Sequence, residues 1–175
     1  EQKVLSLQEK YAHAFKKIRI SHPLIDSDDD FSLAASAIAA QVPTLADDEG
    51  VVFMGHGTPR NNNKAHGYTY VKLQEIFDKM HFPAIVGTVE EEDTPNLEAV
   101  LEKLKERGYK HVHMYPLMVV AGDHANNDMY GDEDDSWKTQ IEALGIKTTG
   151  HLCGLGRAKS IQALYVQHVL RALSI

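Results

Sequence analysis

The chain alternates between short apolar runs and longer segments in which apolar residues recur every three or four positions. Apolar runs predict strands at 51–55, 84–89 and 111–120, and a short strand is expected at 146–151. Helical spacing predicts helices at 3–18, 31–41, 66–80, 94–107, about 135–144 and 160–173. This alternation predicts an α/β fold, with a mostly parallel four-stranded sheet and helices on both faces.

Helix boundaries are indicated by capping residues. Thr94-Pro95 places a proline at a first helical position, while Gly108 and Gly145 follow predicted helices as C-terminal stops. No internal repeat or low-complexity linker interrupts the pattern. We therefore expect two parts, an N-terminal helical connecting segment at 1–45 and an α/β domain with the metal site at 46–175.

Composition narrows the class of protein. A length of 175 residues suits one domain, or one domain plus an appendage, and no apolar run reaches the roughly 18 residues that a membrane span needs. The net charge of −7, without a basic stripe, argues against nucleic-acid binding. The single cysteine, Cys153, excludes an intrachain disulfide and is interpreted as a small buried residue. We expect a cytoplasmic protein, or a periplasmic one if a signal peptide has been removed.

Three successive predicted strands end at residues that can bind metal. His56, Glu90 and His124 follow the first, second and third strands. The carboxyl ends of parallel strands share one edge of a sheet, where ligands bind in α/β folds. Two imidazoles and a carboxylate form a partial shell for a divalent transition metal with positions left open. A glycine near each histidine leaves room for a bulky partner. The spacing alone does not decide among three alternatives: a metal site, an acid–base site, and ordinary polar residues at strand ends.

The remaining histidines do not share this placement. His111 and His113 begin their strand and are expected at the solvated bottom of the sheet, whereas His151 is a candidate for supporting the ligands. Surface positions are expected for the histidines on helices and turns, His13, His22, His66, His81 and His168. The acidic run at 132–135 is interpreted as a solvated cap before Trp137, with transfer of a cation as the alternative.

Four segments carry a family resemblance. VVFMGHGT, VGTVE, MYPLMVVAGDHANNDMYGDEDDSWK and GLGRAKSI together resemble the anaerobic, sirohydrochlorin-type cobalt chelatases, members of the class II chelatases, over roughly 50–172. The resemblance implies ATP-independent insertion of Co²⁺ into sirohydrochlorin or precorrin-2 in cobalamin biosynthesis. It implies that His56, Glu90 and His124 bind the metal and that His56 accepts pyrrole protons. Glu90 is preferred to Glu91 because it directly follows the VGTV strand.

Alternatives stay open within and beyond this family. The ligand set also suits Fe²⁺ and Ni²⁺, as in a ferrochelatase or nickel chelatase on the same scaffold. Members of the family usually have two similar halves around the tetrapyrrole, and this chain resembles the second half plus a connecting helix. We therefore expect a homo-oligomer, pairing with a separate N-terminal half, or a non-catalytic metal- or tetrapyrrole-binding half-domain. Arg60 and Lys64 are candidates for pairing with substrate carboxylates, or are ordinary surface charges.

Overall fold

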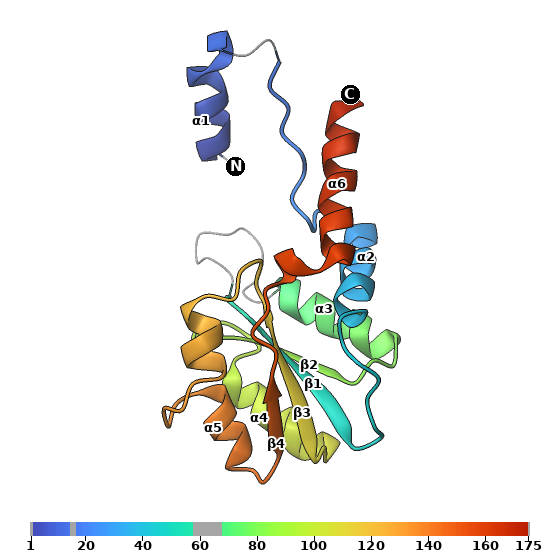
Figure 1. The fold of residues 1–175 in the computed structure, drawn as a ribbon, viewed down its shortest axis with the longest axis vertical. Coiled ribbons are helices and arrows are strands. Elements are labelled where there is room, and N and C mark those ends of the chain that lie inside the picture. The colour runs from blue at the N-terminus through green and yellow to red at the C-terminus, as the bar shows by residue number, and fades with distance from the viewer. Residues whose placement is uncertain (1, 15–16, 58–67, 175) are drawn as a thin grey trace.

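Four parallel strands form one sheet in the order β2-β1-β3-β4 (Figure 1). The computed structural model describes residues 2–14, 17–57 and 68–174. The strands are β1 (Glu49–Gly55), β2 (Ala84–Thr88), β3 (His111–Leu117) and β4 (Lys147–Gly150). The helices are α1 (Gln2–Lys10), α2 (Asp28–Ala39), α3 (Tyr68–Lys79), α4 (Leu97–Arg107), α5 (Trp137–Glu142) and α6 (Lys159–Leu173). Shorter helical segments are the 3₁₀ helices η1 (Ala12–Ala14) and η3 (Leu155–Arg157) and the π-helix η2 (His124–Met129). The predicted parallel α/β architecture is confirmed.

Alternate strand residues enter two separate core clusters. Val51 and Phe53 of β1 pack with α2, α3 and α6 on one face of the sheet. Val52 and Met54 pack with α4 and α5 on the other face. Because successive side chains of a strand point to opposite faces, one apolar strand supplies both layers. Helices on both faces fix the sheet, and the carboxyl ends of β1, β2 and β3 are held at one edge.

The first predicted helix and the third predicted strand are shorter in the structure. The predicted helix at 3–18 is shorter, since α1 ends at Lys10 and is followed by η1. Leu7 and Tyr11 of its apolar stripe are 46% and 43% exposed, so no core stabilises a longer helix. The predicted strand at 111–120 ends at Leu117, and Val120 is 72% exposed. Among the described helices, none has the length and apolarity to cross a bilayer.

The start of α4 also differs from the prediction. Asn96, not Thr94, is the N-cap, and its side chain accepts a hydrogen bond from the Ala99 N–H. The carbonyl of Pro95 accepts from the Thr88 N–H at 2.8 Å, so Pro95 is bonded to the end of β2 and does not open the helix. The predicted stop at Gly108 is confirmed, because this residue is the C-cap of α4 with a φ of 69°. The predicted stop at Gly145 was wrong, because α5 ends at Glu142 with Ala143 as its C-cap, and Gly145 lies in the turn that follows.

Asp30 joins α2 to α6. It completes a capping box with Ser27, and its Oδ1 lies 3.4 Å from His168 Nε2 and 3.7 Å from Arg171 Nη1. Both Asp30 and His168 are buried. The prediction that His168 lies on the surface was wrong, because α6 turns this face onto α2. Burial raises the pKa of Asp30, but hydrogen bonds from Ser27 and the Asp26 N–H, together with nearby His168, lower it overall.

Replacing Asp30 by asparagine should therefore cost about 1–2 kcal/mol of unfolding free energy at pH 7. A carboxyl group whose pKa is lowered by folding stabilises the protein above its unfolded pKa of about 3.9, and that contribution disappears as pH falls through the folded pKa. Urea denaturation at pH 7 and pH 3 should show the difference between wild type and Asp30→Asn shrinking at the lower pH. The exposed neighbour Asp29 supplies the control, Asp29→Asn. An equal difference at both pH values would contradict the assignment.

Candidate metal centre

The carboxyl edge of the sheet brings His56, Glu90 and His124 together. His56 directly follows β1, Glu90 lies two residues after β2, and His124 begins η2 after β3. His56 Nδ1 lies 3.9 Å from Glu90 Oε1. The His56 and His124 rings meet edge to face, with centroids 4.8 Å apart. His56 thus stands between the other two groups, in the juxtaposition that the strand ends predict.

This cluster is open to solvent. The side chains of His56, Glu90 and His124 are 58%, 55% and 43% exposed. Glu90 and His124 line a cavity of about 420 Å³, whose other walls are Val89, Glu91, Glu92 and Asp128. Four carboxylates around the same hollow favour a cation. A hydrated metal ion can therefore reach the imidazoles from solvent.

The two glycines that flank His56 serve the protein's own packing. A Cβ on Gly55 would lie 2.0 Å from the Tyr70 ring, and a Cβ on Gly57 would lie 2.5 Å from Glu90 Cγ. The Gly57 N–H donates to Tyr70 Oη at 3.1 Å, and burial raises the pKa of Tyr70, which keeps this phenol neutral. The expectation that these glycines leave room for a ligand was wrong, because Tyr70 and Glu90 occupy that room. Gly57 adopts a φ of 123°, which other residues rarely tolerate.

Asp128 is a site residue that the sequence reasoning missed. Its Oδ2 lies 2.5 Å from His124 Nδ1, four positions along η2. A carboxylate at that distance favours a proton on Nδ1 and leaves the lone pair on Nε2 of His124. The sequence HANND at 124–128 already contained the signal, because His124 and Asp128 are four residues apart and such residues are neighbours on a helix.

Acidic side chains beyond Glu90 line two neighbouring cavities. Glu91 and Asp128 line both the cavity beside His124 and a neighbouring one of about 570 Å³, which Asp135 also reaches. The rest of the run at 132–134 is exposed, and Asp132 pairs with Lys138 at 2.5 Å. Its exposure fits the expected solvated cap. Arg60 and Lys64, the predicted partners of substrate carboxylates, lie outside the described residues.

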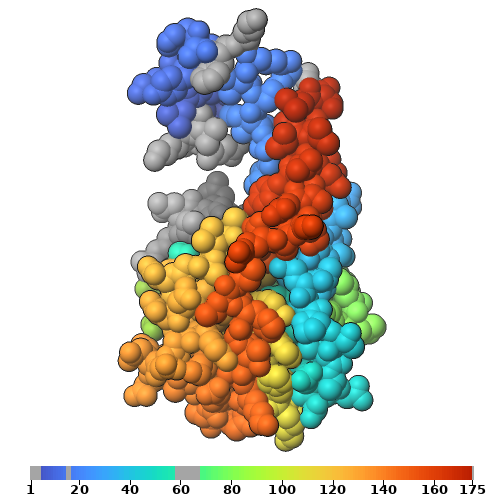
Figure 2. All heavy atoms as spheres, viewed as in Figure 1, coloured from blue at the N-terminus to red at the C-terminus, as the bar shows by residue number. Residues whose placement is uncertain are grey.

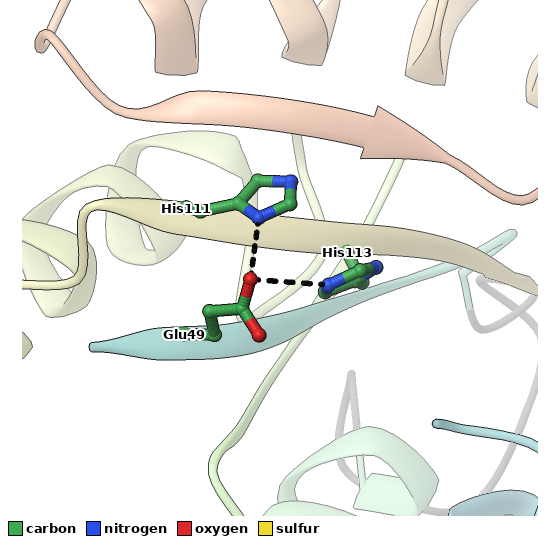
Figure 3. A group of neighbouring side chains, drawn as sticks. All are labelled: Glu49, His111 and His113. Carbon is green, nitrogen blue, oxygen red and sulfur yellow. Dashed lines mark hydrogen bonds and ion pairs between the residues drawn. The ribbon is translucent and has the colours of Figure 1, made fainter. Parts of the chain in front are cut away.

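His111 and His113 do not lie free at the bottom of the sheet. They share one face of β3 and meet Glu49 of β1, as Figure 3 shows. Their side chains are only 25% and 12% exposed, so the expected solvated position was wrong. Burial and the neighbouring His111 lower the pKa of His113. The sheet therefore carries a second group of ligand-type side chains, at the opposite end from His56.

The structure contradicts two further predictions, on His151 and Cys153. His151 Nε2 lies 3.0 Å from His113 Nδ1, and its ring stacks on Tyr115 with centroids 4.2 Å apart. It therefore supports the second group and not the cluster at His56. Cys153 is exposed, so its interpretation as a buried residue was wrong.

Comparisons with known proteins agree on one family. The family model described as cobalt chelatase (CbiK) matches residues 2–174. Sirohydrochlorin cobaltochelatase of Salmonella typhimurium LT2 is 39% identical over 161 residues, covering 92% of this chain and 59% of that protein. Sirohydrochlorin cobaltochelatase CbiKC of Nitratidesulfovibrio vulgaris Hildenborough is 30% identical over 161 residues, covering 91% and 55%. The chain thus spans little more than half the length of these relatives.

A solved structure shares the fold. A protein of Marinobacter aquaeolei VT8, described as a CbiX protein of cobalamin (vitamin B12) biosynthesis, aligns with a TM-score of 0.51 at 18% identity. The alignment covers 70% of this chain and 94% of that one. At this identity the likeness concerns the fold alone.

Proposed function

Because the chain belongs to the CbiK cobalt chelatase family, we propose that it acts in a sirohydrochlorin cobaltochelatase, which inserts Co²⁺ into sirohydrochlorin or precorrin-2 without ATP. The observation that carries this proposal is the contact of His56 with both Glu90 and His124 at the carboxyl edge of the sheet. The reaction is a step of cobalamin biosynthesis by the route in which cobalt enters early. We place it in the cytoplasm.

His56, Glu90 and His124 are proposed to hold the incoming ion. Imidazole and carboxylate bind Co²⁺ without the strength of thiolates, so the ion can pass to a macrocycle with four nitrogens. Three protein ligands leave coordination positions open for water and then for ring nitrogens. His124 would bind through Nε2, because Asp128 holds its Nδ1. Fe²⁺ and Ni²⁺ are the alternative substrate ions for the same ligands.

His56 is also proposed to accept protons. Insertion replaces two pyrrole N–H protons by one Co²⁺, so two protons must leave the ring for each ion that enters. An imidazole is suited to this transfer near neutral pH. The 58% exposure of the His56 side chain lets the accepted proton pass to solvent. Because a neutral imidazole has one free lone pair, His56 would accept a proton once the ion has left it for the ring, and it would pass that proton to solvent before taking the next.

The tetrapyrrole needs a second wall, which we propose comes from another copy of the chain or from an N-terminal half. The cavity at His124 is open, and the chain spans 59% of its Salmonella relative. Apolar side chains on α6 are also uncovered, with Val166, Val169, Leu170 and Leu173 between 49% and 62% exposed. Figure 2 shows α6 extending beyond the α/β body. Arg60 and Lys64 are proposed to pair with carboxylates of the substrate.

The test is an insertion assay with the chain alone. Sirohydrochlorin and Co²⁺ are mixed anaerobically without ATP, and the visible spectrum of the macrocycle is followed with and without protein. We expect insertion faster than in the protein-free mixture, and parallel runs with Fe²⁺ and Ni²⁺ rank the three ions. A chain that binds Co²⁺ or the macrocycle but does not accelerate insertion would exclude a second copy as the missing wall, and would make this chain by itself a non-catalytic binding half-domain.

A further inference from the structure

A second cluster of metal-ligand side chains lies at the start of the strands. Glu49 of β1 is the register partner of His111 of β3, and His113 follows two residues later on the same face. The available ligand atoms of these three residues lie within 4.8 Å of one another. Along β3, His111 is about 20 Å from the strand's carboxyl end, so this cluster is separate from the one at His56.

The side chains converge on a single carboxylate oxygen. Glu49 Oε1 lies 2.8 Å from His111 Nδ1 and 3.9 Å from His113 Nε2, the two contacts drawn in Figure 3. The other oxygen, Oε2, accepts a hydrogen bond from the Ala46 N–H at 2.9 Å. The Ala46 N–H thus fixes the orientation of the Glu49 carboxylate, and Oε1 is directed toward the two imidazoles.

Each imidazole is also held at the nitrogen that faces away from Glu49. His111 Nε2 lies 2.9 Å from Thr149 Oγ1, and His113 Nδ1 lies 3.0 Å from His151 Nε2. When these outer nitrogens carry the protons and donate them, the inner nitrogens present lone pairs beside Glu49 Oε1. Outer hydrogen bonds of this kind orient histidine ligands and set their tautomers in metal sites.

From this arrangement we infer a second divalent metal site, with Glu49 Oε1, His111 Nδ1 and His113 Nε2 as ligands. Two imidazoles and a carboxylate, with no thiolate, suit a first-row ion such as Zn²⁺ or Co²⁺. The three side chains are 24%, 25% and 12% exposed, which leaves a solvent side where water completes the coordination. The ion would connect the starts of β1 and β3. The inference does not rest on the proposed chelatase function.

The direct test removes the site at His56 first. The untagged His56→Ala/His124→Ala chain is titrated with Zn²⁺ by calorimetry, and we expect one ion per chain. Adding His111→Gln/His113→Gln should abolish this binding, whereas adding His13→Ala/His22→Ala, two exposed histidines, should leave it unchanged. No Zn²⁺ binding in the first variant, or the same stoichiometry after the glutamine substitutions, would overturn the inference.

A second readout covers the case in which the glutamine variant fails to fold. Glu49→Gln keeps the size of the side chain and an oxygen for the Ala46 N–H but loses the ligand charge. In the His56→Ala/His124→Ala background, bound Co²⁺ should give visible d–d absorption. Titration followed by this absorption should show a cobalt affinity at least tenfold lower after Glu49→Gln. Zn²⁺ should also raise the thermal unfolding midpoint of that background, because an ion that binds only the folded state stabilises it. An unchanged cobalt spectrum and affinity after Glu49→Gln would count against the site.

Discussion

Replacing His124 by alanine should abolish cobalt insertion and lower the affinity for Co²⁺ by more than about 100-fold. The loss of a residue that merely orients a ligand costs roughly 10- to 100-fold in metal affinity, and the loss of the ligand itself should exceed this. His124 is 43% exposed and starts a short helix, so its removal should leave the folded core unchanged. Calorimetric titration with Co²⁺ and the initial rate of insertion measure the two effects.

A matched control separates this effect from the loss of any exposed histidine–aspartate pair. His22 Nδ1 lies 2.8 Å from Asp26 Oδ2, also four residues along the chain, and is 73% exposed. His22→Ala should leave both cobalt affinity and insertion unchanged. Asp128→Asn keeps the ligand but weakens its orientation, so it should fall between wild type and His124→Ala. Unchanged turnover in His124→Ala would remove His124 from the proposed site.

The fold was predictable in large part because the central strand β1 and its neighbour β2 are apolar on both faces. The run at 51–54 reads as a buried strand since Val51 and Phe53 fill one core while Val52 and Met54 fill the other. The structure of the segment before α2 could not be predicted as well from the apolar pattern. An apolar stripe at helical spacing predicts a helix, but Leu7 and Tyr11 stay exposed and the helix ends early. Periodicity describes which face could be buried, and only tertiary packing decides whether it is.

The grouping at His56 followed from topology, whereas its supporting contacts did not. Parallel strands bring their ends to one edge, and this suffices to place His56 near Glu90 and His124. The fit of Glu90 against Gly57 depends on backbone angles that the sequence does not specify. At the other end of the sheet, His111 and His113 were recognisable as neighbours on one face of a strand. Their partner Glu49 required the register of β1 against β3.

Replacing His56 by alanine should slow insertion by about 10²- to 10⁴-fold even when Co²⁺ is saturating, because the variant lacks the proposed proton acceptor. Glu90 and His124 remain to bind the ion, so a higher cobalt concentration should restore occupancy of the site but not the rate. Initial rates across a range of Co²⁺ concentrations separate the two, since a residue that only binds metal would alter the half-saturating concentration and spare the maximal rate. His13→Ala, at an exposed histidine of η1, provides the control.

Added imidazole gives the same prediction a second measurement. The His56 side chain is 58% exposed, so the space left by alanine is open to a small base from solvent. Imidazole should therefore raise the rate of His56→Ala at saturating Co²⁺ and have little effect on His124→Ala, in which the ion itself is poorly held. If saturating Co²⁺ alone restores the wild-type rate of His56→Ala, His56 is a metal ligand only. The pyrrole protons would then have to leave through another base at the same edge, with the Glu90 carboxylate, 3.9 Å from His56, as the nearest candidate in the cluster.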